Sequence, residues 1–317
     1  MERPTRRAWL RSAAGFVGAS LVAGAAETGA RPRRKFTMDL RCGAIGVRAD
    51  QRRAIELAHR YGFESVEPLP AYLAGLGPGE LEELVGQLHA KGLAWGAAGL
   101  PVNFRADEAT FGKGMRRLPD LARALERAGA SRVGTWISPR HGQLTYLANF
   151  RQHAARLRQV ARILGDHGQR LGLEYVGPKT SWTAGRYPFI HTMAEMKELI
   201  AEIGRDNVGL VLDSWHWYTA GETGADLLSL SNRDVVACDL NDAPAGIPVD
   251  QQQDNRRELP AATGVIDLKV FLGALVAIGY DGPVRAEPFN RRLNAMPDEE
   301  AVAATAAAMK RAFALVE

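Results

Sequence analysis

The chain has 317 residues, of which 46% are hydrophobic and 24% are charged. This composition is that of a globular protein, and the length suits one large α/β domain or two small ones. The formal charge of +4 comes from residues 1–35, which alone carry +6, so the rest of the chain carries −2. A slightly acidic body gives no electrostatic reason to expect nucleic-acid binding.

The N-terminal segment predicts export. Thr5–Arg11 resembles the twin-arginine export motif, a run of small and apolar residues follows from Ser12 to Ala23, and Ala23-Gly-Ala25 has the pattern of a cleavage site. The run is too short and too rich in glycine to span a bilayer comfortably. We therefore expect residues 1–35 to be a signal peptide with a short linker, and the mature protein to be periplasmic without a stable membrane span. An anchoring helix that is not cleaved is the alternative.

From residue 36 onward, strand and helix signals alternate. The predicted strands are Phe36–Val47, Ser65–Leu69, Ala94–Leu100, Arg132–Ser138, Arg170–Val176, Asn207–Asp213, Asp234–Leu240 and Pro283–Pro288. Amphipathic helices are predicted over Arg52–Tyr61, Gly79–Lys91, Gly114–Ala128, Phe150–His167, Met193–Ile203, Ala225–Leu230, Leu268–Ile278 and Pro297–Leu315. This alternation predicts a single (β/α)8 TIM barrel over residues 36–317. An open doubly wound sheet is disfavoured because no Gly-x-Gly-x-x-Gly follows a strand.

Two further features bear on the barrel. Cys42 and Cys238 fall in predicted strands, where buried free thiols are expected and a disulfide is not required. The connections over residues 177–192 and 242–267 are unusually long and leave the C-terminal ends of strands. Long loops at that rim commonly border the substrate, so we expect both to do so.

Four predicted strands end in an acid. Glu174, Asp213, Asp239 and Glu287 follow or close short apolar runs that belong to consecutive staves of the barrel. Carboxylates brought together repel one another unless they are protonated or share a cation. A divalent-metal site is therefore predicted, and oxygen ligands favour Mn²⁺ or Mg²⁺, with Co²⁺ or Zn²⁺ also compatible.

These residues carry a family resemblance. Leu173-Glu174, Leu212-Asp213-Ser-Trp-His216, Leu240-Asn-Asp242 and Ala286-Glu-Pro-Phe289 resemble the xylose isomerase-like TIM barrels, the AP endonuclease 2 superfamily that includes sugar phosphate isomerases and epimerases. The resemblance implies that Glu174, Asp213, Asp239 and Glu287 bind one divalent metal, and that Glu174 and Glu287 form the catalytic acid–base pair. Asp239 stands where the family has a histidine. It either ligates through oxygen or marks a site that has lost its metal.

Further rim residues are candidates for contacts with substrate. His216 and Arg257 match family positions that hold a sugar hydroxyl or an oxyanion. Metal ligation or a structural role is the alternative for His216, and a solvated loop position is the alternative for Arg257. Glu67 ends the second predicted strand, where an ion pair explains it equally well. Trp182 and other rim tryptophans offer faces for sugar rings, although core packing accounts for any single one of them.

The predicted activity is that of a metal-dependent sugar or keto-sugar isomerase or epimerase. Proton abstraction beside a carbonyl gives a metal-held enediolate, and return of the proton completes isomerisation or epimerisation. A lyase or hydratase acting on 3-keto-glycosides by the same chemistry is the first alternative, and a non-catalytic sugar-binding barrel is the second. The expected partner is a small-molecule sugar rather than nucleic acid or membrane, and a homo-oligomer is left open.

Overall fold

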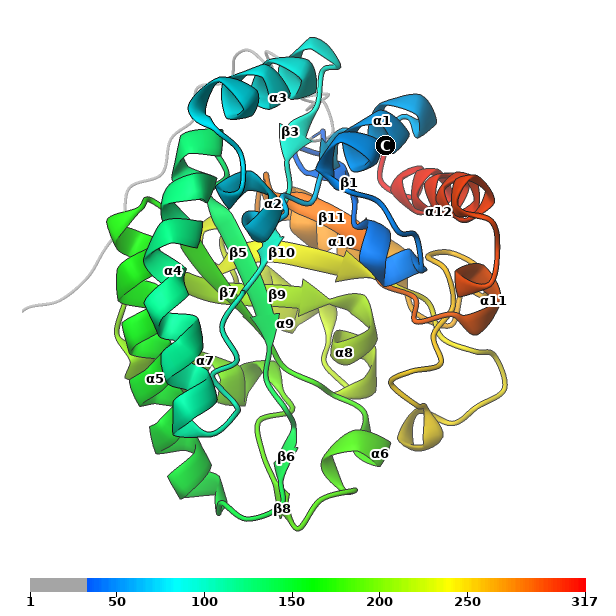
Figure 1. Ribbon diagram of the computed structural model, residues 1–317. Helices are drawn as coiled ribbons and strands as arrows, with labels where there is room; N and C mark the ends of the chain where they lie inside the picture. The colour runs from blue at the N-terminus through cyan, green and yellow to red at the C-terminus, as the bar shows by residue number, and fades with distance from the viewer. Residues whose placement is uncertain (1–32) are drawn as a thin grey trace, which may run out of the picture. The chain divides into compact units, whose positions relative to one another are not determined.

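The computed structural model describes residues 33–317. Its main sheet has nine strands in the order β3-β2-β1-β11-β10-β9-β7-β5-β4, and every pair in it is parallel (Figure 1). The two ends of this order, β3 and β4, are separated by only Gly96 and Ala97, so one chain segment joins both edges of the sheet. The predicted barrel is confirmed, with its third strand interrupted between β3 and β4.

The strands of the barrel are short. Their bounds are β1 Thr37–Leu40, β2 Ser65–Val66, β3 Ala94–Trp95, β4 Ala98–Gly99, β5 Arg132–Trp136, β7 Arg170–Glu174, β9 Val208–Asp213, β10 Val235–Leu240 and β11 Pro283–Ala286. All six residues of β9 and all six of β10 are buried. That burial on both faces explains why their sequences are continuous apolar runs rather than alternating ones.

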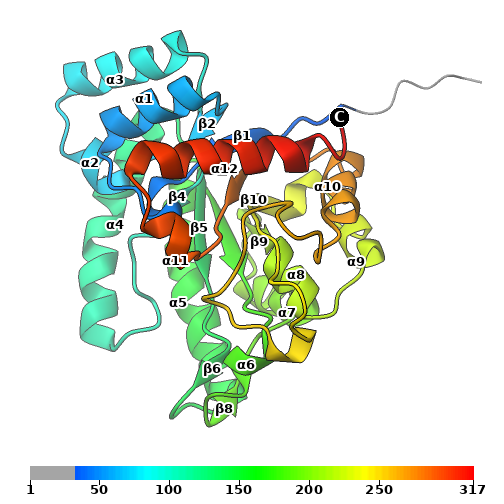
Figure 2. The same cartoon turned by 90° about the vertical axis from the view of Figure 1, so that its right-hand side faces the viewer.

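Helices cover the outside of the sheet. The longer ones are α1 Gln51–Tyr61, α3 Pro78–Ala90, α4 Glu108–Ala128, α5 Tyr146–Asp166, α7 Met193–Ile203, α10 Leu268–Ala277 and α12 Asp298–Phe313. The short ones are α2 Pro70–Ala74, α6 Lys179–Trp182, α8 Ser214–Thr219, α9 Gly224–Leu228 and α11 Arg291–Asn294, with 3₁₀ turns η1 Cys42–Ile45, η2 Asn232–Asp234 and η3 Val249–Gln251. Figure 2 shows α12 lying across the outer face of β11 with α1 beside it.

Several predicted boundaries were wrong. The first strand ends at Leu40 instead of Val47, because the chain turns into η1 at the rim. Helices α4 and α5 begin earlier than predicted, at Glu108 and Tyr146, because Asp107 and Thr145 cap them by accepting a hydrogen bond from the third helical N–H. The short helix α8, which carries His216, was not predicted.

One close approach explains the break in the third stave. A Cβ built on Gly96 would lie 2.2 Å from Oδ1 of Asp39, so only glycine leaves room for that buried carboxyl. Asp39 therefore occupies the space that a side chain of the third stave would otherwise fill. Polar groups thus extend from the rim into the interior of the barrel.

The predicted signal peptide lies almost wholly outside the described residues. Arg34 is described, and it pairs with Glu64 at 2.8 Å and with Glu317 at 2.6 Å, so contacts with the barrel begin before residue 36. Within residues 33–317, no helix has the length and apolar character needed to cross a membrane. Cys42 and Cys238 are free and buried, as expected.

Candidate active site

The four predicted carboxylates meet at the C-terminal end of the barrel. Glu174 ends β7, Asp213 ends β9, Asp239 lies in β10 and Glu287 follows β11. All four are less than a tenth exposed. Ionised carboxyls at that depth are costly unless each one finds a cation, a hydrogen-bond donor or a proton.

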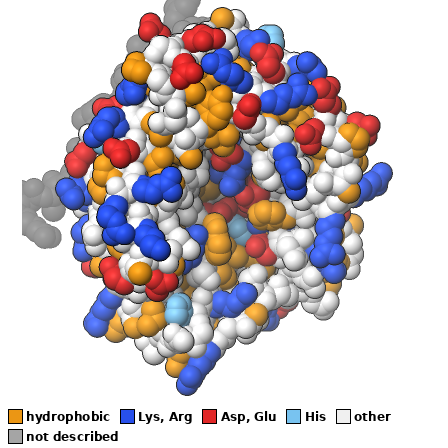
Figure 3. Space-filling model, viewed as in Figure 1, with side chains coloured by type: hydrophobic (Ala, Val, Ile, Leu, Met, Phe, Trp, Pro, Cys, Tyr) orange, Lys and Arg blue, Asp and Glu red, His pale blue; other side chains and the backbone are white. Residues whose placement is uncertain are grey.

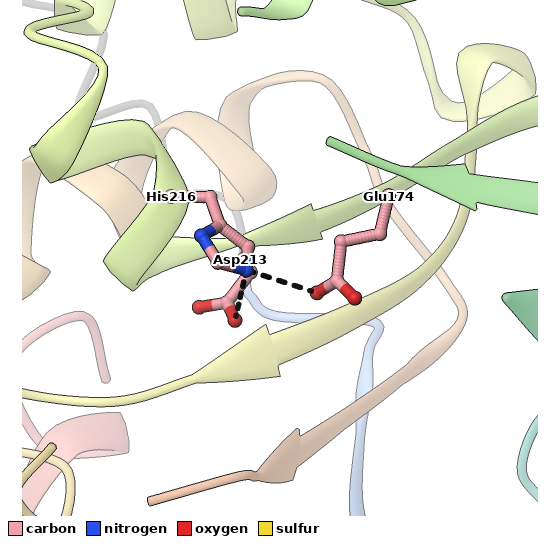
Figure 4. A group of neighbouring side chains, drawn as sticks. All are labelled: Glu174, Asp213 and His216. Carbon is pink, nitrogen blue, oxygen red and sulfur yellow. Dashed lines mark ion pairs between the residues drawn. The ribbon is translucent and has the colours of Figure 1, made fainter. Parts of the chain in front are cut away.

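The carboxylates form two overlapping groups that share Glu174. In one group, Glu174 lies with Asp213 and His216, and in the other it lies with Asp239 and Glu287. Within each group the potential ligand atoms are all within 4.8 Å of one another. Figure 4 shows Nε2 of His216 directed toward Asp213 and Glu174, at 3.7 and 3.9 Å from their nearest oxygens.

The imidazole of His216 has a hydrogen-bond donor beside each of its nitrogens. The backbone N–H of Gly177 lies 3.2 Å from its Nδ1, and NH2 of Arg257, which can only donate, lies 3.3 Å from its Nε2. Burial lowers the pKa of His216, which favours the neutral ring. A neutral imidazole accepts at only one nitrogen, so these contacts are compatible with either tautomer, and the ring faces the cavity beside Glu174 and Asp213.

Asp213 already has a full set of hydrogen-bond donors. Its Oδ1 accepts from the backbone N–H of Trp215 at 2.7 Å and from Nδ2 of Asn241 at 2.9 Å. Its Oδ2 accepts from Arg257 at 2.7 Å. The bond to Trp215 also caps α8, which fixes the position of His216 one residue further along.

Arg257 reaches the centre of the site from the long loop after β10. Its guanidinium is buried, with NH1 lying 3.4 Å from Oε2 of Glu287 and NH2 donating to Asp254 at 2.8 Å. It therefore supplies positive charge to Asp213, Asp254 and Glu287 together. The sequence prediction placed this arginine on the rim, and the structure brings it into contact with the predicted carboxylates.

Asp239 is paired from below the rim. Nε of Arg285, on the neighbouring strand β11, donates to its Oδ1 at 2.6 Å. Burial opposes ionisation of Asp239, but the Arg285 guanidinium outweighs it and holds the pKa of that carboxyl below its ordinary value. The metal-ligand role of Asp239 stays a prediction, and its second oxygen is the more weakly held one, 3.3 Å from Arg285.

Glu174 and Glu287 behave in the opposite way. Burial, reinforced by the neighbouring carboxylates, raises the pKa of Glu174 well above its ordinary value. Burial and Asp239 raise the pKa of Glu287 to about 7, although Arg41 and Arg257 oppose the shift. Two carboxyls with raised pKa values in one site are suited to accepting and returning protons near neutral pH.

The second group of carboxylates fits a divalent cation. Oε1 of Glu174 is buried and has no hydrogen-bond partner among residues 33–317, so a lone pair remains for a ligand. Glu174, Asp239 and Glu287 offer only oxygen atoms, which are the donors that hard divalent ions prefer. Asp213 belongs to the first group, with Glu174 and His216, and its predicted role as a ligand stays a prediction.

A cavity of about 440 Å³ opens above these groups. Its walls include Arg41, Glu67, Trp136, Glu174, Val176, His216, Asp254, Arg257, Glu287 and Phe289. Figure 3 shows the hollow, with acidic, basic and histidine side chains exposed at its floor. Glu67 lines it, with its carboxylate 3.4 Å from Arg41. Trp182 does not line it, since its ring stacks on His191 at 4.7 Å.

Sequence reasoning missed three charged residues of the site. Arg41 donates to Oε1 of Glu287 at 2.6 Å from the end of β1, Asp254 anchors Arg257, and Arg285 pairs with Asp239. Only Arg285 carried a local signal, because a charged residue inside an otherwise apolar strand requires a buried partner. The partners of Arg41 and Asp254 depend on contacts far apart in sequence or on the loop conformation.

A curled, parallel barrel sheet with a cluster of buried acids at its C-terminal rim defines the class of protein. The chain belongs to the xylose isomerase-like TIM barrel family, whose model matches residues 55–312. A solved xylose isomerase domain protein from Alicyclobacillus acidocaldarius is 32% identical, with a TM-score of 0.74 over 86% of this chain and 96% of that one. The structure of an IOLI protein, described with a zinc atom bound, is 20% identical, with a TM-score of 0.71 over 88% of this chain and 98% of that one.

Two relatives of known activity are enzymes. Inosose isomerase of Bacillus velezensis is 24% identical over 254 residues, which are 78% of this chain and 86% of that protein. 3-Dehydroshikimate dehydratase of Pseudomonas aeruginosa is 30% identical over 142 residues, which are 44% of this chain and 21% of that longer protein.

Proposed function

We propose that this protein is a divalent-metal-dependent isomerase or epimerase of a non-phosphorylated keto-sugar or a similar hydroxylated ring ketone. The observation that carries the proposal is the pair of buried glutamates, Glu174 and Glu287, whose raised pKa values coincide in one cavity. The similarity to inosose isomerase supports the substrate class. The zinc described in the IOLI structure supports a metal.

The residues divide the chemistry between them. An ionised glutamate takes the proton from the carbon beside the carbonyl, and the C–H electron pair moves toward the carbonyl oxygen to give an enediolate. The other glutamate, still protonated, returns a proton to the same carbon for epimerisation or to the neighbouring carbon for isomerisation. The guanidinium of Arg257 and the imidazole of His216, which lie 3.3 Å apart, are placed to contact the oxygen on which negative charge develops.

Glu174, Asp239 and Glu287 would hold the cation. When bound, a divalent cation polarises a carbonyl oxygen and so acidifies the adjacent C–H. Arg41 and Arg257 then have a separate task, which is to keep one glutamate ionised while the other retains its proton. If either glutamate is replaced by glutamine, the site lacks either the group that takes the proton or the group that returns it.

A dehydratase or lyase is the second candidate. Elimination begins with the same proton abstraction and differs only in expelling a β-hydroxyl or other β-substituent from the enediolate. The similarity to 3-dehydroshikimate dehydratase favours it over other reactions of the enediolate. Product analysis distinguishes the two, since elimination leaves a conjugated double bond with ultraviolet absorption.

The test combines metal content with solvent deuterium uptake. Purified protein is examined by elemental analysis, then incubated in D₂O with inososes, ketohexoses and 3-keto-glucosides while proton NMR follows exchange beside the carbonyl. We expect about one divalent ion per chain, and exchange that falls at least 10³-fold in Glu174→Gln and in Glu287→Gln. The exposed Glu82→Gln is the matched control. If the protein takes up no added Mn²⁺ or Zn²⁺ and no substrate exchanges hydrogen for deuterium, the non-catalytic sugar-binding barrel becomes the preferred interpretation.

A further inference from the structure

A second cavity adjoins the one that holds the glutamates. It has a volume of about 500 Å³ and shares three wall residues with the first, Trp136, Val176 and Asp254. Its remaining walls are Ser138, Pro139, Arg140, Thr180, Ser181, Ala184, Gln253 and Asn255. Each cavity alone has the volume of a small-molecule site, so the two adjacent cavities offer more room than one sugar ring requires.

The walls of the second cavity are tied together. They come from the end of β5, from β6 Arg140–His141, which pairs with β8 Tyr187–Pro188, from α6, and from the loop after β10. Oγ1 of Thr180 donates to the carbonyl of Gln252 at 2.6 Å, and Lys179 pairs with Asp250 at 2.7 Å. The two long loops predicted to border the substrate therefore meet each other. A site built before its ligand arrives loses less entropy on binding.

The second cavity offers donors and acceptors that suit a hydroxyl-rich ring. The side chains of Ser181, Gln253 and Asn255 make no hydrogen bond to any other residue that the structure describes, so their donors and acceptors are available. Of the two charged wall residues, Asp254 accepts from Arg257, whereas Arg140 donates through one nitrogen to the carbonyl of Ser181 and has no acidic partner among the described residues. The remaining N–H groups of Arg140 are further donors for a ring hydroxyl.

Trp136 adds a platform at the junction of the two cavities. Its side chain is 46% exposed, and the guanidinium of Arg105 lies 4.2 Å from the ring centroid on one side. Aromatic faces are good surfaces for the C–H faces of sugar rings. An indole that lines both cavities is placed to contact a substrate where it crosses from one to the other.

A third cavity also adjoins the first and has a different character. It shares Gly43 and Glu67 with the first cavity, and its walls are mostly apolar, such as Leu40, Val47 and Val66, with Arg48 and Asp50 as further charged residues. Such walls give a hydroxylated ring few partners for its polar groups, which then lose hydrogen bonds to water without replacement.

We propose that the cavity lined by Ser181, Gln253 and Asn255 is a subsite for a second sugar ring, so that the preferred substrate is a keto-sugar in glycosidic linkage rather than a free monosaccharide. The substrate class rests on the proposed function, because the processed ring must lie against Glu174 and Glu287. The second ring binds through neutral amide and hydroxyl groups and across Trp136.

Binding is tested without catalysis. Saturation-transfer NMR titrations compare maltose, cellobiose and trehalose with methyl α-D-glucoside, for the wild type and for Gln253→Ala/Asn255→Ala, whose two side chains are exposed. We expect at least one disaccharide to bind about tenfold more tightly than the methyl glucoside, and the double variant to remove that advantage while binding the methyl glucoside unchanged. Arg48→Ala, in the third cavity, is the control and should alter neither affinity.

Enzymatic turnover provides a second test of the subsite. Deuterium uptake is measured for the 3-keto derivatives of the same disaccharides and of methyl glucoside, and the double variant should raise KM for the disaccharide alone. Equal binding of one-ring and two-ring probes, equal losses for both probes in the double variant, or a loss in Arg48→Ala instead would each overturn the subsite. If no probe exchanges deuterium while the two-ring preference persists in binding, the subsite stands and the proposed chemistry fails.

Discussion

Two buried arginines neutralise carboxylates in this barrel, and the elements that hold them differ. Arg285 lies on β11 and pairs with Asp239 on the adjacent strand, where the two residues are register partners in the parallel sheet. Arg257 comes from a long loop and pairs with Asp213, Asp254 and Glu287. Both guanidinium groups are almost fully buried, yet one is fixed by the sheet and the other by a loop.

This difference suggests different roles, in which Arg285 stabilises the fold and Arg257 takes part in the reaction. A pair held within a sheet cannot change partners without disturbing the barrel, so its charge is permanently compensated. A loop arginine can share its donors among several acids and a substrate, which suits a site where charge changes during a reaction. The pKa of Asp239 is lowered, whereas burial raises the pKa of Glu287 to about 7 even though Arg257, 3.4 Å away, opposes the shift.

Removing the sheet arginine should have the largest effect on folding. Arg285→Met leaves the Asp239 carboxylate buried and uncompensated, and we expect the free energy of unfolding to fall by about 3–5 kcal/mol. Urea denaturation in the presence of a chelator measures this without stabilisation by metal.

Arg285→Met/Asp239→Leu is the matched variant, because it removes both charges and should recover most of the loss. Arg52→Met, at a partly exposed arginine whose partner Glu83 lies 3.5 Å away, should leave the urea midpoint unchanged. A double variant as unstable as the single one would show that Arg285 contributes through packing rather than through its pair with Asp239.

The sequence could predict the carboxylates of the site, but not which arginines pair with them. Apolar runs that end in Glu174, Asp213, Asp239 and Glu287 predicted the rim cluster, because parallel strands bring their C-terminal ends together. The sequence could not show that Asp239 is paired and that Oε1 of Glu174 has no hydrogen-bond partner in the part of the chain that the structure describes. That difference depends on where the side chain of Arg285 lies inside the barrel. The helix around His216 was also missed, because a helix of six residues has too few turns to show a periodic pattern of apolar residues.

Removing the loop arginine should instead affect activity. Arg257→Met takes away a donor near the developing oxyanion and a cation beside Glu287, and we expect kcat/KM to fall about 100-fold. Stability should change less than in Arg285→Met, because Asp213 keeps its bonds to Asn241 and Trp215.

Arg257→Lys serves as the companion variant. It retains the charge but not the planar arrangement of donors, and it should recover part of the activity without recovering all of it. The comparison between the two arginines fails if Arg257→Met loses as much unfolding free energy as Arg285→Met under the same conditions.

The smallest effect is expected at Asp39, the acid that Arg285 leaves without a hydrogen bond. Asp39 and Arg285 are register partners on β1 and β11, but both carboxyl oxygens of Asp39 lack a hydrogen-bond partner among the described residues. Burial raises the pKa of Asp39 to about 7, and the attraction of Arg285 only partly opposes it. The folded state therefore binds a proton more tightly at Asp39 than the unfolded state does.

The sign of the pH dependence follows. Below about pH 4 the carboxyl is protonated in both states and costs nothing, whereas between about pH 4 and 7 only the unfolded state releases the proton, so stability falls as the pH rises. Asp39→Asn resembles the protonated form and should be more stable than the wild type by about 1–3 kcal/mol at pH 8, with the advantage disappearing near pH 4. Urea unfolding of both proteins from pH 4 to 8 measures the difference. A wild type that gains stability relative to Asp39→Asn as the pH rises from 4 to 8 would mean that Arg285 holds Asp39 ionised as it holds Asp239, and the two acids beside this arginine would then be equivalent.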